Sequence, residues 1–268
     1  MIPNVLSIAG SDPGGGAGLQ GDLKTFAALG VFGCAVPTVL TAQSTRAVAA
    51  VLPVPAAFVT QQLETLLDDV RVGAVKIGML GDAEVVHAVA AILRRYRPPN
   101  VVLDPVLRAS TGGARLDAAG LAALRDELLP LVDLVTPNLP EAGALLGEEA
   151  PPSLPAAEAA ARRLLGLGVP AALVTGGHFE GTTMCTDVLA TGERVRLLHT
   201  PRVPGGGAHG TGCALSSAIA ALLARGEPLP AACAEAQRVV ARAIRDGRRL
   251  AVGGGTGPVD VGGAVRRT

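Results

Sequence analysis

The chain has 268 residues, no tryptophan, and only 2% aromatic residues. A flat ring bound by this protein would therefore rest mainly on aliphatic and sulfur-containing side chains. Lysine is also scarce, since Lys24 and Lys76 are the only two and arginine supplies the other basic side chains. The formal net charge is zero, which gives no electrostatic case for a nucleic acid or an anionic membrane as partner.

Cysteine is sparse and scattered along the chain. The four residues form no C-x-x-C pair and have no disulfide-like density, which argues against a disulfide framework; they are Cys34, Cys185, Cys213 and Cys233. We interpret all but Cys213 as small buried side chains. Zinc motifs are absent as well, because histidine and cysteine do not cluster and no H-E-x-x-H occurs.

Long apolar runs are missing too. None approaches the roughly 20 residues that a membrane-spanning helix needs, and the first residues lack the basic and apolar regions of a signal peptide. Hydrophobic residues nevertheless make up 49% of the chain, enough for a large core. We therefore expect a cytoplasmic protein.

Strand-like and helix-like segments alternate about every 25–35 residues, which predicts an α/β fold with a mostly parallel central sheet. A hairpin is expected at 186–198. The Pro-rich segment 151–155 is interpreted as a loop, so that 1–268 form a single domain. The expected strands are 5–9, 32–42, 74–78, 101–104, 134–136 and 171–175, and the expected helices are 19–29, 58–69, 83–95, 118–129, 156–167, 214–224 and 229–244.

Polar side chains gather where these strands end. In parallel α/β sheets, ligands bind beyond the carboxyl ends of the strands, so these residues should meet in one crevice. They are Asp12, Gln43, Met79, Asp104, Asn138, Glu141 and the segment 175–178.

A glycine-rich stretch, 205–212, leads directly into the Ala/Leu-rich helix expected at 214–224. A helix N-terminus has unpaired N–H groups and a partial positive charge, and together these bind anions, phosphate above all. Cys213 lies at this junction, where the helix N-terminus would lower the pKa of its thiol. His209 could touch a substrate or simply cap the loop.

A second glycine-rich stretch contains G-x-G-x-x-G at Gly16, Gly18 and Gly21. This pattern occurs in dinucleotide-binding folds, but those also place an acid at the end of the second strand, and 41–44 contain none. Two other interpretations stay open: a closely packed glycine turn, and a loop that closes over a small substrate with Asp12 or Asp22 as polar contacts.

Other catalytic signatures are missing. No G-x-x-x-x-G-K-[ST] occurs for a Walker-type nucleotide site and no G-x-S-x-G for an α/β-hydrolase. Asp104, Asn138 and Glu141 form a possible magnesium arrangement, since Mg²⁺ takes one or two carboxylates and bridges to substrate phosphates. Equally, Asn138 could be a helix N-cap and Glu141 an acid in the first turn.

Taken together, the sequence resembles the hydroxymethylpyrimidine/phosphomethylpyrimidine kinases of thiamine biosynthesis, in the ribokinase-like superfamily. This resemblance implies a three-layer α/β/α fold, ATP and Mg²⁺ as cofactors, and a homodimer. The matching segments extend over almost the whole chain in the family's order; they are 8–13, 15–18, 22–26, 41–43, 76–79, 103–106, 136–142, 176–178, 209–213 and 257–258.

The resemblance also assigns roles. The pyrimidine pocket would be lined by Gly10, Ala17, Gln43, Met79 and Val106, with Asp12, Asp22 and His209 as further substrate contacts. ATP and its phosphates would be bound by Asn138, Glu141, Thr175 and Gly177, and Mg²⁺ by Asp104 and Glu141. The anion hole would be formed by Gly210, Thr211, Gly212 and Cys213, with Cys213 at the position of the superfamily's catalytic base.

Three departures from the family pattern remove cations that bind phosphate. Thr175 replaces a common lysine, a loop lysine is missing near Ser110, and glycines and an alanine occupy 205–208. Each lost phosphate contact would weaken binding by about 1.5–3 kcal/mol, although Arg108 or Arg202 could compensate. The second phosphorylation, from monophosphate to diphosphate, should be weakened most by the missing cations, because it must hold more negative charge.

Three alternatives therefore remain. A pyridoxal-type kinase of the same fold is one alternative, because the pyridoxal ring also carries a hydroxymethyl group that could be phosphorylated. A catalytically weak sensor would keep the pyrimidine pocket without the phosphate cations. An NAD-dependent enzyme would use the Gly16–Gly21 pattern.

Overall fold

The computed structural model describes residues 1–107, 116–177, 183–192, 194–204 and 209–263. Its centre is one sheet with the strand order β3-β2-β1-β4-β5-β6-β7-β8-β9. The strands are β1 (Asn4–Ser11), β2 (Phe32–Gln43), β3 (Val48–Pro53), β4 (Ala74–Ile77), β5 (Val101–Leu103), β6 (Leu134–Val135), β7 (Ala171–Val174), β8 (Met184–Thr191) and β9 (Arg194–Pro201). Strands β2, β1 and β4–β7 pair in parallel, whereas β3, β8 and β9 join antiparallel. The prediction of a mostly parallel sheet is confirmed.

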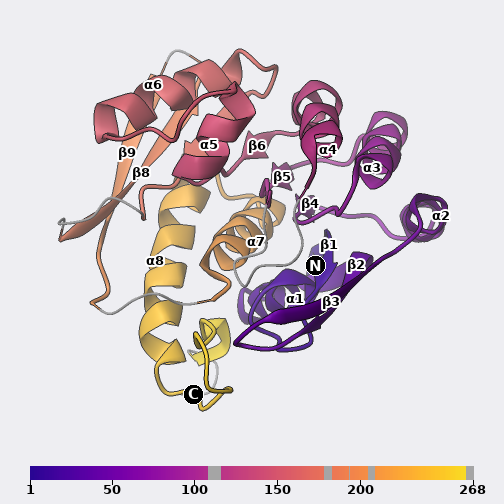
Figure 1. Cartoon of the computed structure of the whole chain (residues 1–268), viewed down its shortest axis with the longest axis horizontal. Coiled ribbons are helices and arrows are strands. Elements are labelled where there is room, and N and C mark those ends of the chain that lie inside the picture. The colour runs from indigo at the N-terminus through magenta and orange to yellow at the C-terminus, as the bar shows by residue number, and fades with distance from the viewer. Residues whose placement is uncertain (108–115, 178–182, 193, 205–208, 264–268) are drawn as a thin grey trace.

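Helices cover both faces of this sheet, as the ribokinase-like resemblance implies (Figure 1). One apolar cluster packs α1, α7 and α8 against one face, and a second packs α2–α6 against the other. The helices are α1 (Gly18–Ala28), α2 (Ala56–Leu67), α3 (Ala83–Tyr96), α4 (Ala118–Ala123), α5 (Leu139–Leu146), α6 (Leu154–Leu165), α7 (Thr211–Ala224) and α8 (Leu229–Gly247).

The alternation of side chains along a strand assigns residues to these faces. Val5 and Ala74 belong to the cluster under α1, α7 and α8, whereas the next residues, Leu6 and Val75, belong to the opposite cluster. The central strands are therefore apolar on both faces, as expected for a parallel sheet covered by helices on both sides.

Three elements differ from the sequence-based prediction: strand β3 and helix α5 were not predicted, and the helix expected at 118–129 changes its type along its length. Strand β3 was not predicted, because five of its six residues are exposed at the sheet edge and show no alternation. The helix expected at 118–129 is α4 followed by a π-helical turn, Leu124–Leu128, and a 3-10 turn, Leu129–Leu131. Pro130 lies in the 3-10 turn, where its missing backbone N–H prevents the α-helix from resuming.

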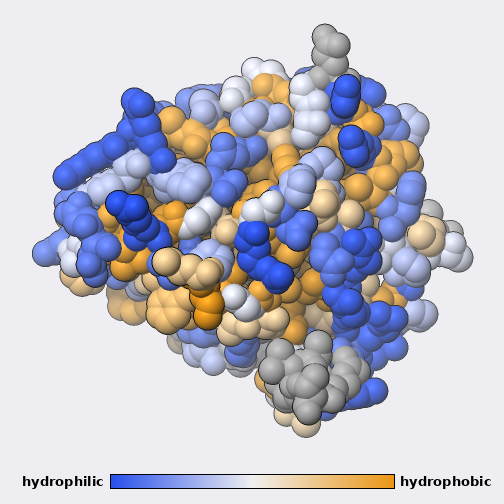
Figure 2. All heavy atoms as spheres, turned by 180° about the vertical axis from the view of Figure 1, so that it is seen from behind, coloured by the Kyte–Doolittle hydropathy of each residue, from blue (hydrophilic) through white to orange (hydrophobic). Residues whose placement is uncertain are grey.

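Seen from behind, apolar residues lie in patches between hydrophilic side chains rather than on one continuous apolar face (Figure 2). Among the described residues, no helix is both long and apolar enough to cross a membrane.

Candidate active site

A cleft of about 280 Å³ lies where the parallel strands end and where α1 and α7 begin. It brings together most of the residues singled out from the sequence: Gly10, Asp12, Ala17, Gln43, Met79, Asp104, Val106, Asn138, Glu141, Thr175, His209, Gly210, Thr211, Gly212 and Cys213. The expectation of one crevice at the strand ends is therefore met. Asp22 and Gly177 do not line it.

The N-terminus of α7 forms one wall of the cleft. Gly210 is its N-cap in the left-handed region, with φ 85°, and no side chain caps the helix. A Cβ at this position would lie 1.8 Å from the Gly16 carbonyl oxygen, so only glycine fits. In the described part of the chain, the backbone N–H groups of Thr211, Gly212 and Cys213 have no hydrogen-bond acceptor. This turn therefore offers the unpaired donors and the positive helix end that an anion needs.

The N-terminal glycine loop has a different arrangement, because its N–H groups are already occupied. The Asp12 carboxylate accepts hydrogen bonds from Gly14, Gly16 and Ala17, at 2.9, 3.1 and 2.9 Å. Close packing also accounts for Gly18, where a Cβ would lie 2.3 Å from the Gly10 carbonyl oxygen. The glycine pattern is thus a closely packed turn bound to a carboxylate.

His209 joins the two loops. Its Nε2 lies 3.0 Å from Asp12 Oδ2 and 3.4 Å from Gln43 Nε2. Burial raises the pKa of Asp12, but the hydrogen bonds from His209 and from the loop N–H groups outweigh it and hold this pKa below its ordinary value. Gln43 is held in turn by the Thr41 hydroxyl at 3.3 Å. A ring bound against these side chains would meet an amide on the β2 end of the cleft.

The capping interpretation of Asn138 and Glu141 is confirmed, and the same two side chains also line the cleft. The Asn138 side chain accepts from the Glu141 N–H and the Glu141 carboxylate accepts from the Asn138 N–H, each at 2.9 Å, so the pair forms a capping box on α5. The Glu141 carboxylate nevertheless lines the cleft together with Asp104. Burial and the neighbouring Asp104 carboxylate raise the pKa of Glu141 to about 8.

The chemistry of Cys213 differs from the sequence-based expectation. Burial raises the pKa of its thiol to about 12, since the Asp104 and Asp22 carboxylates add to burial and together outweigh Lys76. The prediction that the helix N-terminus lowers this pKa is therefore wrong, because local sequence does not show which charges surround the sulfur. The Asp104 carboxylate interacts electrostatically with this thiol.

Asp22 lies beneath the cleft rather than in it. Its carboxylate is fully buried and paired with the Lys76 ammonium at 2.9 Å, so the structure does not support it as a substrate contact. Sequence analysis missed Lys76 as a site residue, although it lines the cleft. The signal available in the sequence was a lysine inside an apolar strand, which is rare without a buried partner.

The predicted phosphate side of the cleft is only partly described. Gly177 does not line it, and its carbonyl accepts from Arg202 Nη1 at 3.0 Å. Thr175 lies at the end of β7, where its N–H donates to the Pro137 carbonyl at 2.9 Å. The expectations for Arg108, Ser110, His178 and 205–208 fall outside the described residues.

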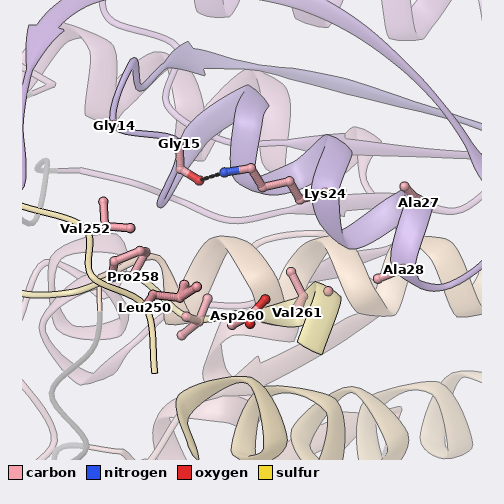
Figure 3. Close-up of a pocket in the computed structure, with 12 residues that line it drawn as sticks. Gly14, Gly15, Lys24, Ala27, Ala28, Leu250, Val252, Pro258, Asp260 and Val261 are labelled. Atoms are coloured by element: carbon pink, nitrogen blue, oxygen red, sulfur yellow. Dashed lines mark hydrogen bonds between the residues drawn. The ribbon is translucent and has the colours of Figure 1, made fainter. Parts of the chain in front are cut away.

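A second hollow, of about 440 Å³, lies behind the glycine loop between α1 and the segment 250–262 (Figure 3). Its walls are mostly apolar, and Lys24 reaches across one end to donate to the Gly15 carbonyl at 2.6 Å. The glycine loop borders both hollows, since Gly14 and Gly15 line this one and Asp12 and Ala17 line the cleft.

Comparison with known proteins agrees with this geometry. The family model described as phosphomethylpyrimidine kinase matches residues 12–260. The hydroxymethylpyrimidine/phosphomethylpyrimidine kinase of Escherichia coli is 45% identical over 96% of each chain. An ADP complex of Bacillus subtilis pyridoxal kinase has a TM-score of 0.90 and 31% identity, with full coverage of both chains. The phosphomethylpyrimidine kinase of Clostridium difficile has a TM-score of 0.80 and 34% identity, covering 91% of this chain and 100% of that one. The chain belongs to the phosphomethylpyrimidine kinase family.

Proposed function

We propose that this protein transfers the γ-phosphoryl group of ATP to 4-amino-5-hydroxymethyl-2-methylpyrimidine, and then phosphorylates the resulting monophosphate, in thiamine biosynthesis. The observation that carries the proposal is the open first turn of α7. Its unpaired N–H groups face the same cleft as the residues proposed to hold the ring. Phosphoryl transfer needs alignment and charge stabilisation more than covalent chemistry, and this turn offers both.

The ring would bind at the end of the cleft near β1 and β2. Gly10, Ala17, Met79 and Val106 offer a mainly apolar surface there, and the Gln43 amide offers hydrogen bonds to the ring edge. Asp12 and His209 are proposed to hold the loop against the ring rather than to bind it through free donors, since they bond to each other.

The residues that face the phosphate side fit a magnesium ion. Asp104 and Glu141 place two carboxylates in one cleft. Burial raises the pKa of both, and the Asp104 carboxylate raises that of Glu141 further, so a divalent cation would relieve the repulsion between them. Mg²⁺ needs only one or two carboxylates from the protein, because it keeps several waters and binds phosphate oxygens. When bound, Mg²⁺ would neutralise charge on the phosphates.

A proton route follows from the Cys213 environment. A thiol whose pKa is about 12 is protonated at neutral pH, so it cannot accept the hydroxyl proton unless it gives up its own. We propose a relay in which the sulfur takes the proton from the substrate hydroxyl while the S–H proton passes to the Asp104 carboxylate, which lines the same cleft and interacts electrostatically with the thiol. The oxygen–phosphorus bond forms as the γ-phosphoryl group leaves ADP.

The direct test incubates the protein with ATP, Mg²⁺ and the hydroxymethylpyrimidine and resolves monophosphate and diphosphate over time. Monophosphate followed by diphosphate is the expected result. Monophosphate alone would restrict the function to the first step. ATP binding with no phosphorylated product would favour the sensor.

A pyridoxal-type kinase is the second candidate, because the Bacillus subtilis pyridoxal kinase superposes over the full chain. Measuring kcat/KM for the pyrimidine and for pyridoxal, at the same ATP and Mg²⁺ concentrations, separates the two. We expect a preference for the pyrimidine, and a strong preference for pyridoxal would overturn this assignment.

We also propose a cytoplasmic homodimer in which 1–268 form one domain. The continuous nine-stranded sheet supports a single domain. Large apolar side chains exposed on β2, β3 and α2 support self-association; they are Phe32, Leu40, Val51, Leu52 and Phe58. Light scattering coupled to size exclusion would test the dimer, and a monomer at micromolar concentration would contradict it.

A further inference from the structure

The ion pair of Lys76 and Asp22 has no part in the roles assigned so far. The Lys76 ammonium lies 2.9 and 3.0 Å from the two Asp22 oxygens, and both side chains are fully buried. Hydroxyls complete the surroundings of the carboxylate, since Ser7 donates at 2.6 Å and Ser217 at 2.7 Å. One carboxylate on α1 is thus bound from β1, β4 and α7, and each of its oxygens accepts two hydrogen bonds.

The ammonium is less well satisfied than the carboxylate. It has three N–H bonds, and in the described part of the chain its hydrogen bonds go only to the two Asp22 oxygens. The space around it is kept by a glycine, because a Cβ on Gly78 would lie 2.8 Å from Lys76 Nζ. A buried donor without a partner is costly and calls for an explanation.

The ion pair is oriented relative to the cleft. Lys76 lines the cleft and Asp22 does not, so the positive end of the pair is on the cleft side. The groups beyond Asp22 that interact electrostatically with the ammonium are Cys213 and Asp104. Both belong to the cleft wall, one in the first turn of α7 and the other at the end of β5.

The Lys76 ammonium supplies a positive charge at the cleft, where transfer of a phosphoryl group needs one. Among the described residues that line the cleft, Lys76 is the only lysine or arginine. Fixed dipoles aimed at the place where negative charge develops stabilise a transition state without reorganising. A low-dielectric interior makes such a charge effective at longer range than in water.

We propose that Lys76, oriented by Asp22, is a positioning residue: the pair is a preorganised dipole that acts through Cys213 and Asp104 to stabilise the transferring phosphoryl group. The inference rests on the proposed phosphoryl transfer. It differs from a purely structural role, in which the pair would only hold α1 and α7 against the sheet.

The two roles separate because a buried ion pair can be replaced by apolar residues with little loss of stability, whereas removal of one partner is strongly destabilising. The test variant is Lys76→Met/Asp22→Leu, compared with wild type for melting temperature, kcat and both KM values. We expect a melting temperature near that of wild type, KM values within about threefold, and a kcat about 10- to 100-fold lower, in line with the loss of one preorganised electrostatic contact. A folded double variant with wild-type kcat overturns the proposal.

A second variant covers the case in which the apolar pair does not fold. Lys76→Gln/Asp22→Asn removes both charges but keeps hydrogen-bonding groups at both positions. For either folded variant, binding of ADP–Mg²⁺ is measured with and without aluminium fluoride, which mimics the transferring group. The dipole predicts weaker binding of the aluminium fluoride complex and unchanged binding of ADP, whereas equal weakening of both would contradict it.

Ser217→Ala is the matched control, because it removes one hydrogen bond to Asp22 and keeps both charges. We expect kcat within about threefold of wild type, and a loss as large as that of the double variants would point to geometry rather than charge. Failure of the two proposals is distinguishable: a wild-type protein that phosphorylates neither ring contradicts the proposed function, whereas an active wild type matched by its neutral variants contradicts only the dipole.

Discussion

Two glycine-rich loops lead into two helices at this cleft, and they differ in whether a carboxylate of the protein already accepts from the N–H groups of the loop. The loop before α1 surrounds the Asp12 carboxylate, which accepts from three of its N–H groups. The loop before α7 has no such carboxylate, and the first N–H groups of that helix have no acceptor in the described part of the chain. A glycine loop before a helix is therefore not sufficient for a phosphate site, because the protein itself can supply the anion.

A third helix at the cleft extends the comparison. The N-terminus of α5 is closed by its own capping box, formed by Asn138 and Glu141. The three segments thus differ in what accepts from their N–H groups: the Asp12 carboxylate for the loop before α1, a capping side chain for the first turn of α5, and no described group for the first turn of α7.

The largest effect is expected for Gly210→Ala. A Cβ there would meet the Gly16 carbonyl oxygen at 1.8 Å, and the φ of 85° is strained for alanine, so the first turn of α7 must move. We expect kcat to fall about 10³-fold, the loss typical of a removed oxyanion-type donor, in a coupled ADP-release assay. Gly226→Ala is the matched control, because its φ is 89° but nothing lies within 4 Å; it should lose stability and keep its kcat. Equal kcat values for the two variants would contradict a role of the first turn of α7 in phosphoryl transfer.

Glu141→Gln should follow, with a kcat about 10²-fold lower. The glutamine keeps an oxygen that accepts from the Asn138 N–H, so the melting temperature should change little. Asn138→Ala removes the side-chain cap of the Glu141 N–H and should cost about 1 kcal/mol of stability. A glutamine variant as active as wild type would show that Glu141 is a cap alone.

Asp12→Ala tests the α1 loop directly. It leaves the N–H groups of Gly14, Gly16 and Ala17 without their acceptor, so unfolding should become easier by about 2–3 kcal/mol. If the carboxylate is what distinguishes the loops, the variant should recover part of this loss in about 100 mM sulfate, by more than wild type gains. An identical sulfate response in denaturant titrations would contradict that explanation.

The smallest effect concerns pH. The folded-state pKa of Asp12 is held below its ordinary value, so its contribution to stability is present above the unfolded-state pKa of about 3.9 and is lost as pH falls through the lower folded-state value. Asp12→Asn should therefore show a shallower loss of unfolding free energy in this acidic range. The same slope for both proteins would contradict the role of the Asp12 bonds.

Much of this site could be predicted because strand ends are visible in the sequence. Parallel strands place their carboxyl ends at one edge, so Gln43, Asp104 and Asn138 could be expected in one crevice before any side chain was placed. The predicted Asp22 contact failed for a different reason. Its position in the chain, four residues past Gly18, does not show that the carboxylate points inward to Lys76, a partner 54 residues away.

Strand β3 and the pKa of the Cys213 thiol could not be predicted, because both depend on neighbours that are distant in the sequence. The edge strand Val48–Pro53 is defined by its pairing with β2 and not by an alternating pattern of its own. The pKa of Cys213 is decided by burial and by carboxylates from β5 and α1, whereas the local sequence showed only the helix N-terminus, which acts in the opposite direction.

The sequence by itself determined the α/β alternation, the strand ends that carry polar groups and the position of the open glycine–helix junction, since these depend on local propensity and on periodicity. Only the tertiary structure decided which glycine loop had its N–H groups occupied, where Asp22 and Lys76 paired, and what charges surround Cys213. These depend on contacts between residues far apart in the chain, and the free energies of burial and of charge pairing that govern them are set by the three-dimensional surroundings.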